Sequence, residues 1–149
     1  MEDVQIKAIS TKFDGYQFRS RTEARWAVFF KEANTKYIYE EEGFELRSGR
    51  YLPDFYFPDH NIYVEIKGSK PTAEEMNKCQ ELCEMTRNDV ILVCGIPGQC
   101  EVDYFHWIMG QAMYDGGFIF ESLFCRIDNN VDLNKIINVA KQYQFGKIA

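Results

Sequence analysis

The sequence predicts an α/β fold whose elements follow the order αβββαβ, with one more helix near the end of the chain. Two capping boxes of the form Ser/Thr-x-x-Glu each precede apolar residues at helical spacing. Segments rich in aromatic and β-branched residues lie between and after these helices, which predicts the strands. No repeat or Pro/Gly/Ser-rich linker interrupts the chain, so residues 1–149 are expected to form a single domain.

The first predicted helix begins at Ser20 and runs to about Asn34. Its capping box is Ser20-Arg-Thr-Glu23, after which apolar residues recur on one face. In the next segment, residues 36–46, aromatic and charged residues alternate loosely around Gly43. This pattern predicts a half-exposed strand with a break or bulge at the glycine.

Two further strands are predicted at residues 50–57 and 62–67. Both segments are rich in aromatic and β-branched side chains. The residues between them, Pro58-Asp-His-Asn61, are typical of a turn. We therefore expect the two strands to form a β-hairpin.

A second helix is predicted from the capping box Thr72-Ala-Glu-Glu75 to about Thr86. Residues 89–94 then form a short apolar run that ends at Gly95. Such a run is typical of an interior strand.

The last third of the chain is less distinctive. Residues 104–114 fit a helix or a strand, and residues 118–126 resemble a strand after a Gly116-Gly117 break. A final helix is predicted over about 132–143. Four aromatic side chains of this region have two alternative roles, either stacking on bases or forming a dimer face on the one hand, or packing in the core on the other. Core packing is the expected role. These residues are Tyr104, Trp107, Tyr114 and Phe118.

The composition is that of a folded protein, with 46% hydrophobic and 15% aromatic residues. No segment is apolar enough to cross a bilayer, and the N-terminal residues are acidic where a secretory signal would be basic. We therefore expect a cytoplasmic protein that makes no membrane contact.

The cysteines are odd in number and contain no CxxC pair, which argues against a disulfide framework and a zinc ribbon. They are Cys79, Cys83, Cys94, Cys100 and Cys125. Cys79 and Cys83 stand four apart on the second predicted helix and would share a metal with Cys94 or His106 if the chain bound zinc or an iron-sulfur cluster. Buried, reduced thiols are the expected outcome.

The net charge of −6 speaks against a nucleic-acid partner, but the charge is unevenly distributed. Residues 1–70 hold 11 Lys/Arg against 12 Asp/Glu, whereas residues 71–149 hold 6 against 11. The charge of residues 1–70 is therefore compatible with two alternatives, a locally basic face or a solvated surface of mixed sign. The candidates for a basic face are Lys12, Arg19, Arg21, Arg25, Arg47, Arg50, Lys67 and Lys70.

The predicted hairpin brings acidic residues together. If Pro58 to Asn61 form the loop, counting back along the ladder places Asp54 opposite Glu65, with their Cβ atoms about 5 Å apart. Alternation along the strands places Lys67 on the same face, together with Leu52 and Tyr56.

Opposed carboxylates destabilise a sheet unless something neutralises them. A divalent cation such as Mg²⁺ or Mn²⁺ would do so, and Lys67 would then orient the metal-bound water or lower its pKa for attack on phosphorus. The alternative is a solvated face on which Asp54 and Glu65 pair with Arg50 or Lys67.

Glu23 belongs to the same group by periodicity. It precedes Trp26, Ala27 and Phe30 by three, four and seven residues, so it lies on the core-facing side of its helix. There it would hold the metal or its water. The alternative is that Glu23 only completes the capping box.

These residues resemble the signature of the PD-(D/E)xK nuclease superfamily: Pro53-Asp54, ten residues, then Glu65-Ile66-Lys67. The stretch from residue 13 to about 95 is similar to small phage and prophage nuclease-like proteins of that superfamily. The resemblance implies a restriction-endonuclease-like core with a mixed central sheet flanked by helices.

The resemblance also implies a set of site residues. Asp54 and Glu65 would ligate the metal, Glu23 would contact it directly or through water, Ile66 would lend its backbone carbonyl, and Lys67 would act on the attacking water. A polar residue of the following helix, Lys78 or Gln80, would assist. The expected DNA contacts are Arg19, Arg21, Arg25, Lys70, Lys78 and Gln80.

The expected function is a Mg²⁺- or Mn²⁺-dependent deoxyribonuclease, endonucleolytic or structure-specific, in phage or prophage DNA processing. A noncatalytic adaptor or inhibitor on a nuclease scaffold is the second hypothesis, because such folds can lose activity and the chain is acidic. A zinc-binding regulator is the third. The sequence leaves open whether DNA or RNA is cut, whether cleavage is endo or exo, and whether two chains form a homodimer.

Overall fold

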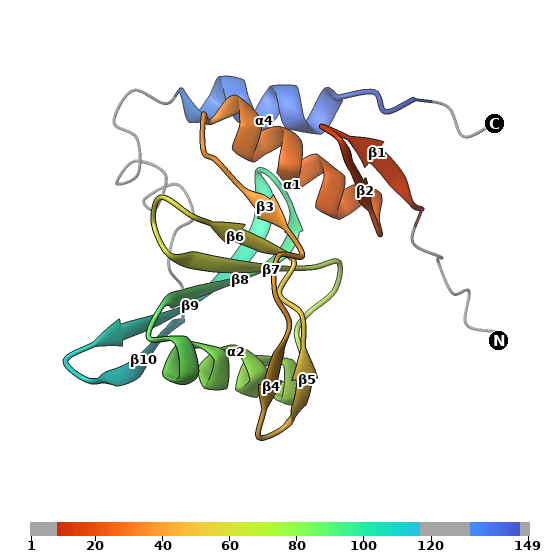
Figure 1. The fold of residues 1–149 in the computed structure, drawn as a ribbon. Coiled ribbons are helices and arrows are strands. Elements are labelled where there is room, and N and C mark those ends of the chain that lie inside the picture. The colour runs from red at the N-terminus through yellow and green to blue at the C-terminus, as the bar shows by residue number, and fades with distance from the viewer. Residues whose placement is uncertain (1–8, 117–131, 147–149) are drawn as a thin grey trace, which may run out of the picture.

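A computed structural model describes residues 9–116 and 132–146 (Figure 1). Its centre is a six-stranded mixed sheet. Helices α1 (Arg21–Glu32) and α4 (Leu133–Gln142) cover one face, and α2 (Ala73–Thr86) covers the other. The predictions of an α/β fold and of a mixed sheet flanked by helices are therefore confirmed.

The strand order in the sheet is β10-β9-β8-β7-β6-β3. Only one pair of neighbours in this sheet, β7 and β8, is parallel, and α2 connects the two strands. The bounds are β3 Ile38–Tyr39, β6 Phe55–Phe57, β7 Ile62–Lys67, β8 Asp89–Ile96, β9 Gln99–Ile108 and β10 Gln111–Gly116. Two small hairpins lie outside the sheet, formed by β1 (Thr11–Phe13) with β2 (Tyr16–Phe18) and by β4 (Phe44–Leu46) with β5 (Gly49–Tyr51).

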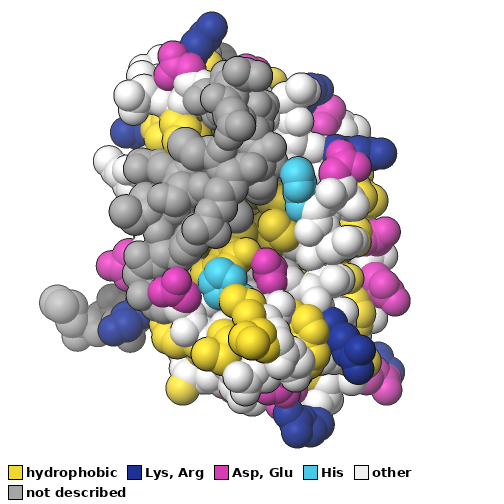
Figure 2. All heavy atoms as spheres, turned by 90° about the vertical axis from the view of Figure 1, so that its left-hand side faces the viewer, with side chains coloured by type: hydrophobic (Ala, Val, Ile, Leu, Met, Phe, Trp, Pro, Cys, Tyr) yellow, Lys and Arg dark blue, Asp and Glu magenta, His cyan; other side chains and the backbone are white. Residues whose placement is uncertain are grey.

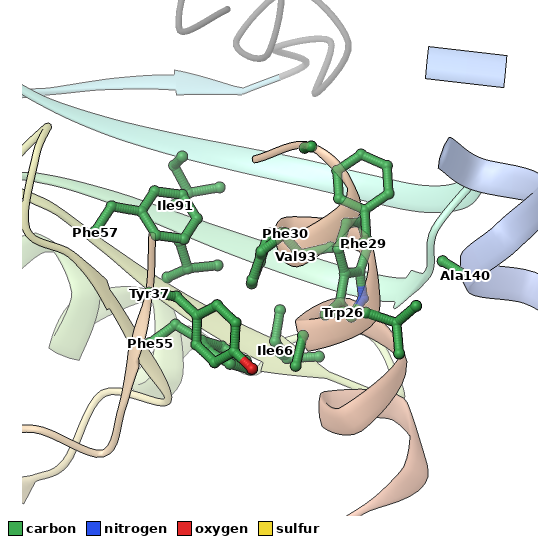
Figure 3. Packing of buried hydrophobic residues seen from close by; sticks show 14 of the residues in the cluster. Trp26, Phe29, Phe30, Tyr37, Phe55, Phe57, Ile66, Ile91, Val93 and Ala140 are labelled. Atoms are coloured by element: carbon green, nitrogen blue, oxygen red, sulfur yellow. The ribbon is translucent and has the colours of Figure 1, made fainter. Parts of the chain in front are cut away.

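Helix α1 is held by its cap and by its apolar face. The Ser20 hydroxyl accepts a hydrogen bond of 3.1 Å from the Glu23 amide. Trp26 and Phe30 are fully buried, and the indole of Trp26 donates to the Gly95 carbonyl at 2.8 Å. Figure 3 shows these rings packed between α1 and the strands, together with Phe55 and Phe57.

Helix α2 begins with the predicted capping box, which is confirmed. The Thr72 hydroxyl accepts from the Glu75 amide at 3.1 Å, and the Glu75 carboxylate accepts from the Thr72 amide at 2.9 Å. Its buried face packs against the sheet face opposite α1. Five residues separate the last residue of β7 from the start of the helix, so its first turn lies near the end of that strand.

Two predicted strands are broken in the structure. Residues 36–46 contribute β3 to the central sheet and β4 to a separate hairpin, so the break predicted at Gly43 is present and changes the pairing partner. Residues 50–57 were predicted as one strand, which is wrong, because β5 ends at Tyr51 and β6 starts at Phe55. Pro53 lies in the gap and has no amide hydrogen for a ladder.

The segment 104–114 is strand rather than helix. Strands β9 and β10 are joined by a two-residue turn, in which Met109 and Gly110 have φ angles of 52° and 83°. The final helix is confirmed as α4. The strand predicted at 118–126 lies outside the described residues.

The β9–β10 hairpin forms one edge of the sheet and carries exposed apolar side chains. Met109 is 95% exposed and Tyr114 52%, whereas Tyr104 is buried as predicted. Figure 2 shows hydrophobic side chains gathered in the lower half of the face on which the β9–β10 turn lies. Phe118 lies outside the described residues. Within the described ranges, no helix is long and apolar enough to cross a membrane.

Candidate active site

The predicted hairpin register is confirmed and brings Asp54 and Glu65 together. Phe57 pairs with Ile62 and Phe55 with Val64. One step further, the Asp54 amide donates to Oε2 of Glu65 at 3.3 Å, and the Ile66 amide donates to Oδ2 of Asp54 at 2.8 Å. Each carboxylate thus accepts a hydrogen bond from a backbone amide on the other side of the hairpin, and we call the two an interlocked pair. Asp54 is 8% exposed and Glu65 is 7% exposed.

The charged forms of Asp54 and Glu65 are disfavoured in this position. Burial, followed by the negative charges of Glu65 and Glu23, raises the pKa of Asp54 well above its ordinary value. Burial also raises the pKa of Glu65, against the lowering effect of the Tyr51 hydroxyl and of Lys67. Two carboxylates in this position favour the uptake of a proton or of a cation.

Tyr51 is a site residue that sequence reasoning missed. Its hydroxyl donates to Oε2 of Glu65 at 2.8 Å. Leu52 was predicted on the same face as the acids, but it is 36% exposed, and Tyr51 is the residue that points to Glu65. The prediction assumes a continuous strand, and the break after Tyr51 changes the phase of the alternation. Tyr56 does lie on the predicted face, where its ring packs against that of Tyr63 with the ring centroids 4.7 Å apart.

Glu23 approaches the acids from α1. Its amide is bonded to the helix cap, but Oε2 of its carboxylate accepts the Tyr39 hydroxyl at 2.5 Å. Burial raises the pKa of Glu23, against hydrogen bonds from Tyr39 and the Arg19 backbone. Since the Glu23 charge acts on Asp54, the structure places it within electrostatic reach of the pair. Tyr39, like Tyr51, could not be identified from local sequence because it acts across 16 residues.

Lys67 lies beside the pair, as predicted. Its ammonium nitrogen is 3.4 Å from Oε1 of Glu65 and 2.6 Å from Oε2 of Glu75. Burial lowers the pKa of Lys67, but the two carboxylates outweigh it and the pKa is raised. Lys67 is therefore a charged hydrogen-bond donor in this site. Sequence reasoning treated Glu75 only as a capping residue, although the five-residue link from β7 to α2 already implied a position near Lys67.

The oxygen donors fit a hard divalent cation. Asp54 and Glu65 supply carboxylate oxygens, and the Ile66 carbonyl faces the Asp54 side, because the N–H and C=O of one strand residue point to the same neighbour. Magnesium is commonly bound through one or two carboxylates together with waters. In the described part of the chain, no group of three or more His, Cys, Asp or Glu side chains is arranged to hold a metal.

The cysteines of α2 have packing roles. Cys79 and Cys83 are buried between the helix and the sheet, as predicted, and burial raises the pKa of each thiol to about 12. Cys94 and Cys100 are half-buried and are not in a disulfide. Cys125 lies outside the described residues.

Several of the residues predicted to form a basic face are paired with acidic side chains. Arg19 contacts Glu40 at 2.8 Å, Arg47 contacts Glu84 at 3.0 Å, and Arg50 contacts Glu45 at 3.7 Å. These pairs fit the alternative of a surface of mixed sign better than a basic face. The exposed residues Lys12, Arg21 and Lys70 stay candidates.

Three other candidate DNA contacts have partners within the fold. The Arg25 guanidinium donates to the Ala140 and Lys141 carbonyls at 2.7 and 2.9 Å, which ties α1 to α4. The Gln80 amide donates to the Ala112 carbonyl at 3.2 Å. Lys78 lies 3.9 Å from Glu74, one turn earlier on α2.

In comparisons with known proteins, neither a family model nor a curated protein matches this chain.

Proposed function

We propose that this chain is a divalent-metal-dependent nuclease that hydrolyses phosphodiester bonds, with DNA as its expected substrate. The observation that carries the proposal is the interlocked pair of buried carboxylates, Asp54 and Glu65, with the Lys67 ammonium 3.4 Å from Glu65. A purely structural role does not account for two acids buried side by side, since their mutual repulsion destabilises the fold.

The arrangement of the elements supports the finer fold proposal, a restriction-endonuclease-like core. A helix that carries Glu23 precedes the hairpin, and the parallel β7-α2-β8 unit follows it. The three acids thus come from the helix and from both sides of the hairpin. A function in phage or prophage DNA processing belongs to the same proposal and is supported by the sequence resemblance. A cytoplasmic location is the expectation for a protein with that function.

Each residue has a distinct part in the proposed mechanism. Asp54, Glu65 and the Ile66 carbonyl would hold Mg²⁺ or Mn²⁺, and Glu23 would hold a water beside it. The cation, when bound, supplies charge neutralisation and a more acidic water. Lys67 keeps its proton, so it would donate hydrogen bonds to the attacking water or to a phosphoryl oxygen and stabilise the negative charge that develops there. The Glu23 carboxylate, whose pKa is raised by burial, would accept the proton that the water releases.

A cleavage assay across substrate shapes tests the proposal. The purified chain is incubated with plasmid, branched DNA, single-stranded DNA and RNA in Mg²⁺ or Mn²⁺. We expect cleavage of at least one DNA form, abolished by Asp54→Asn and retained by Asp59→Asn, which changes an exposed acid of the hairpin loop. Cleavage of no substrate would reject the enzyme and favour the adaptor or inhibitor hypothesis.

A further inference from the structure

Glu75 uses its two carboxylate oxygens for two different contacts. Oε1 accepts the Thr72 amide at 2.9 Å and so closes the capping box of α2. Oε2 contacts the Lys67 ammonium at 2.6 Å. One side chain therefore joins the start of α2 to the last residue of β7.

The capping box fixes the direction of the second oxygen. The Glu75 amide is itself bonded to the Thr72 hydroxyl at 3.1 Å, so backbone and side chain are both tied to the cap. The first oxygen of the carboxylate is therefore held at the cap. The other oxygen is thus presented to Lys67 by the fold of the helix start.

Lys67 is shared unequally between two acids. Its nitrogen is 0.8 Å closer to Glu75 (2.6 Å) than to Glu65 (3.4 Å). Glu65 is also a ligand in the proposed metal site, and a lysine bound tightly to it would compete with a divalent cation for the same oxygens. An acid on the far side of Lys67 weakens that competition.

We propose that Glu75 is a positioning residue that draws the Lys67 ammonium away from Glu65, so that Lys67 stays beside the metal ligands without taking the place of the cation. This inference rests on the proposed nuclease function and deepens it. It accounts for a feature that helix capping alone leaves unexplained, namely that the capping glutamate points its second oxygen at the site lysine.

The test uses Glu75→Gln, because glutamine also completes a capping box and the helix start is therefore kept. The matched control is Glu74→Gln, which removes the adjacent acid, whose side chain is 75% exposed. Mg²⁺ affinity is measured by calorimetry, and kcat and KM are measured separately on the best DNA substrate. A proton–nitrogen spectrum of the lysine ammonium groups reports the Lys67 ion pair in the absence of metal.

We expect Glu75→Gln to weaken Mg²⁺ binding several-fold and to lower kcat by about tenfold, the scale of one charge-assisted contact, with KM for DNA unchanged. The Lys67 ammonium signal should shift or broaden. In a Lys67→Met background the same substitution should leave Mg²⁺ affinity unchanged, because Glu75 acts through Lys67.

The inference is overturned alone if the parent binds Mg²⁺ and cuts DNA but Glu75→Gln behaves like Glu74→Gln. It is also overturned if the effect on Mg²⁺ affinity persists without Lys67. If the parent itself neither binds Mg²⁺ nor cuts, the proposed function fails and takes this inference with it.

Discussion

The hydroxyl of Tyr51 donates a hydrogen bond of 2.8 Å to Oε2 of Glu65, in the layer between α2 and the sheet. This bond lowers the pKa of Glu65 while burial raises it. The tyrosine therefore favours the charged form of the carboxylate, which is the form that binds a cation.

Replacing Tyr51 with phenylalanine should weaken the metal site without unfolding the protein. The lost hydrogen bond to a charged group predicts roughly a tenfold loss of Mg²⁺ affinity, because the carboxylate becomes easier to protonate. Calorimetry at pH 7 measures it. Tyr56→Phe is the matched control, because it removes a hydroxyl bonded to Asn61 outside the site. Equal affinity in the two variants would argue against the assignment.

The raised pKa of Asp54 predicts that the metal-free protein is more stable in acid than in base, as far as this group is concerned. The folded state holds a proton that the unfolded state releases, so stability is kept below the ordinary Asp value of 3.8 and is lost as the pH rises through the raised value. Asp54→Asn removes this loss and keeps an acceptor for the Ile66 amide.

In EDTA at pH 8, the free energy of unfolding of Asp54→Asn should therefore exceed that of the parent by roughly 0.5–2 kcal/mol. The variant should accordingly unfold at a higher temperature. The gain should shrink at pH 4. Thermal unfolding at the two pH values measures it, with Asp59→Asn as the control for an exposed acid. A variant that is less stable than the parent at pH 8 would show that the pair stabilises the fold.

Removing the lysine should separate catalysis from metal binding. Lys67→Ala should lower the cleavage rate about 100-fold or more, because the donor to the reacting groups is lost. Mg²⁺ affinity should be kept or increased, since no ammonium competes for Glu65. Lys36→Ala, at an exposed position, is the control. Wild-type cleavage by Lys67→Ala would remove this residue from the mechanism.

The two arginines of α1 should behave differently. Arg25→Gln should destabilise the protein by roughly 1–2 kcal/mol, because its guanidinium bonds two carbonyls of the α4 end. Arg21→Gln should leave unfolding unchanged, raise KM for DNA and reduce the salt dependence of binding by about one phosphate contact. Denaturant titrations and binding at several salt concentrations distinguish them. A normal stability of Arg25→Gln would contradict the structural role.

The hairpin and its register were predictable because local chemistry determines them. The turn residues Pro58 to Asn61 fix the loop, and the period of two then places Asp54 next to Glu65. The cap of α2 was predictable for the same reason, since Thr72 and Glu75 are three residues apart.

The remaining features depend on contacts between distant segments. The hydroxyls of Tyr39 and Tyr51 reach their glutamates across 16 and 14 residues, which no local pattern encodes. Pro53 is a local signal for the break in residues 50–57, but the pairing of β5 with β4 in a separate hairpin is not encoded by it. The turn between β9 and β10 was missed because Met109, a residue that rarely adopts positive φ, occupies its first position.

The account depends most on whether Asp54 and Glu65 bind a divalent cation, and calorimetric titration of the metal-free protein with Mg²⁺ and Mn²⁺ measures this directly. The predicted result is a binding site in the parent and in Asp59→Asn that is lost in Asp54→Asn and in Glu65→Gln. Absence of binding in the parent, or equal binding in all four proteins, would contradict it.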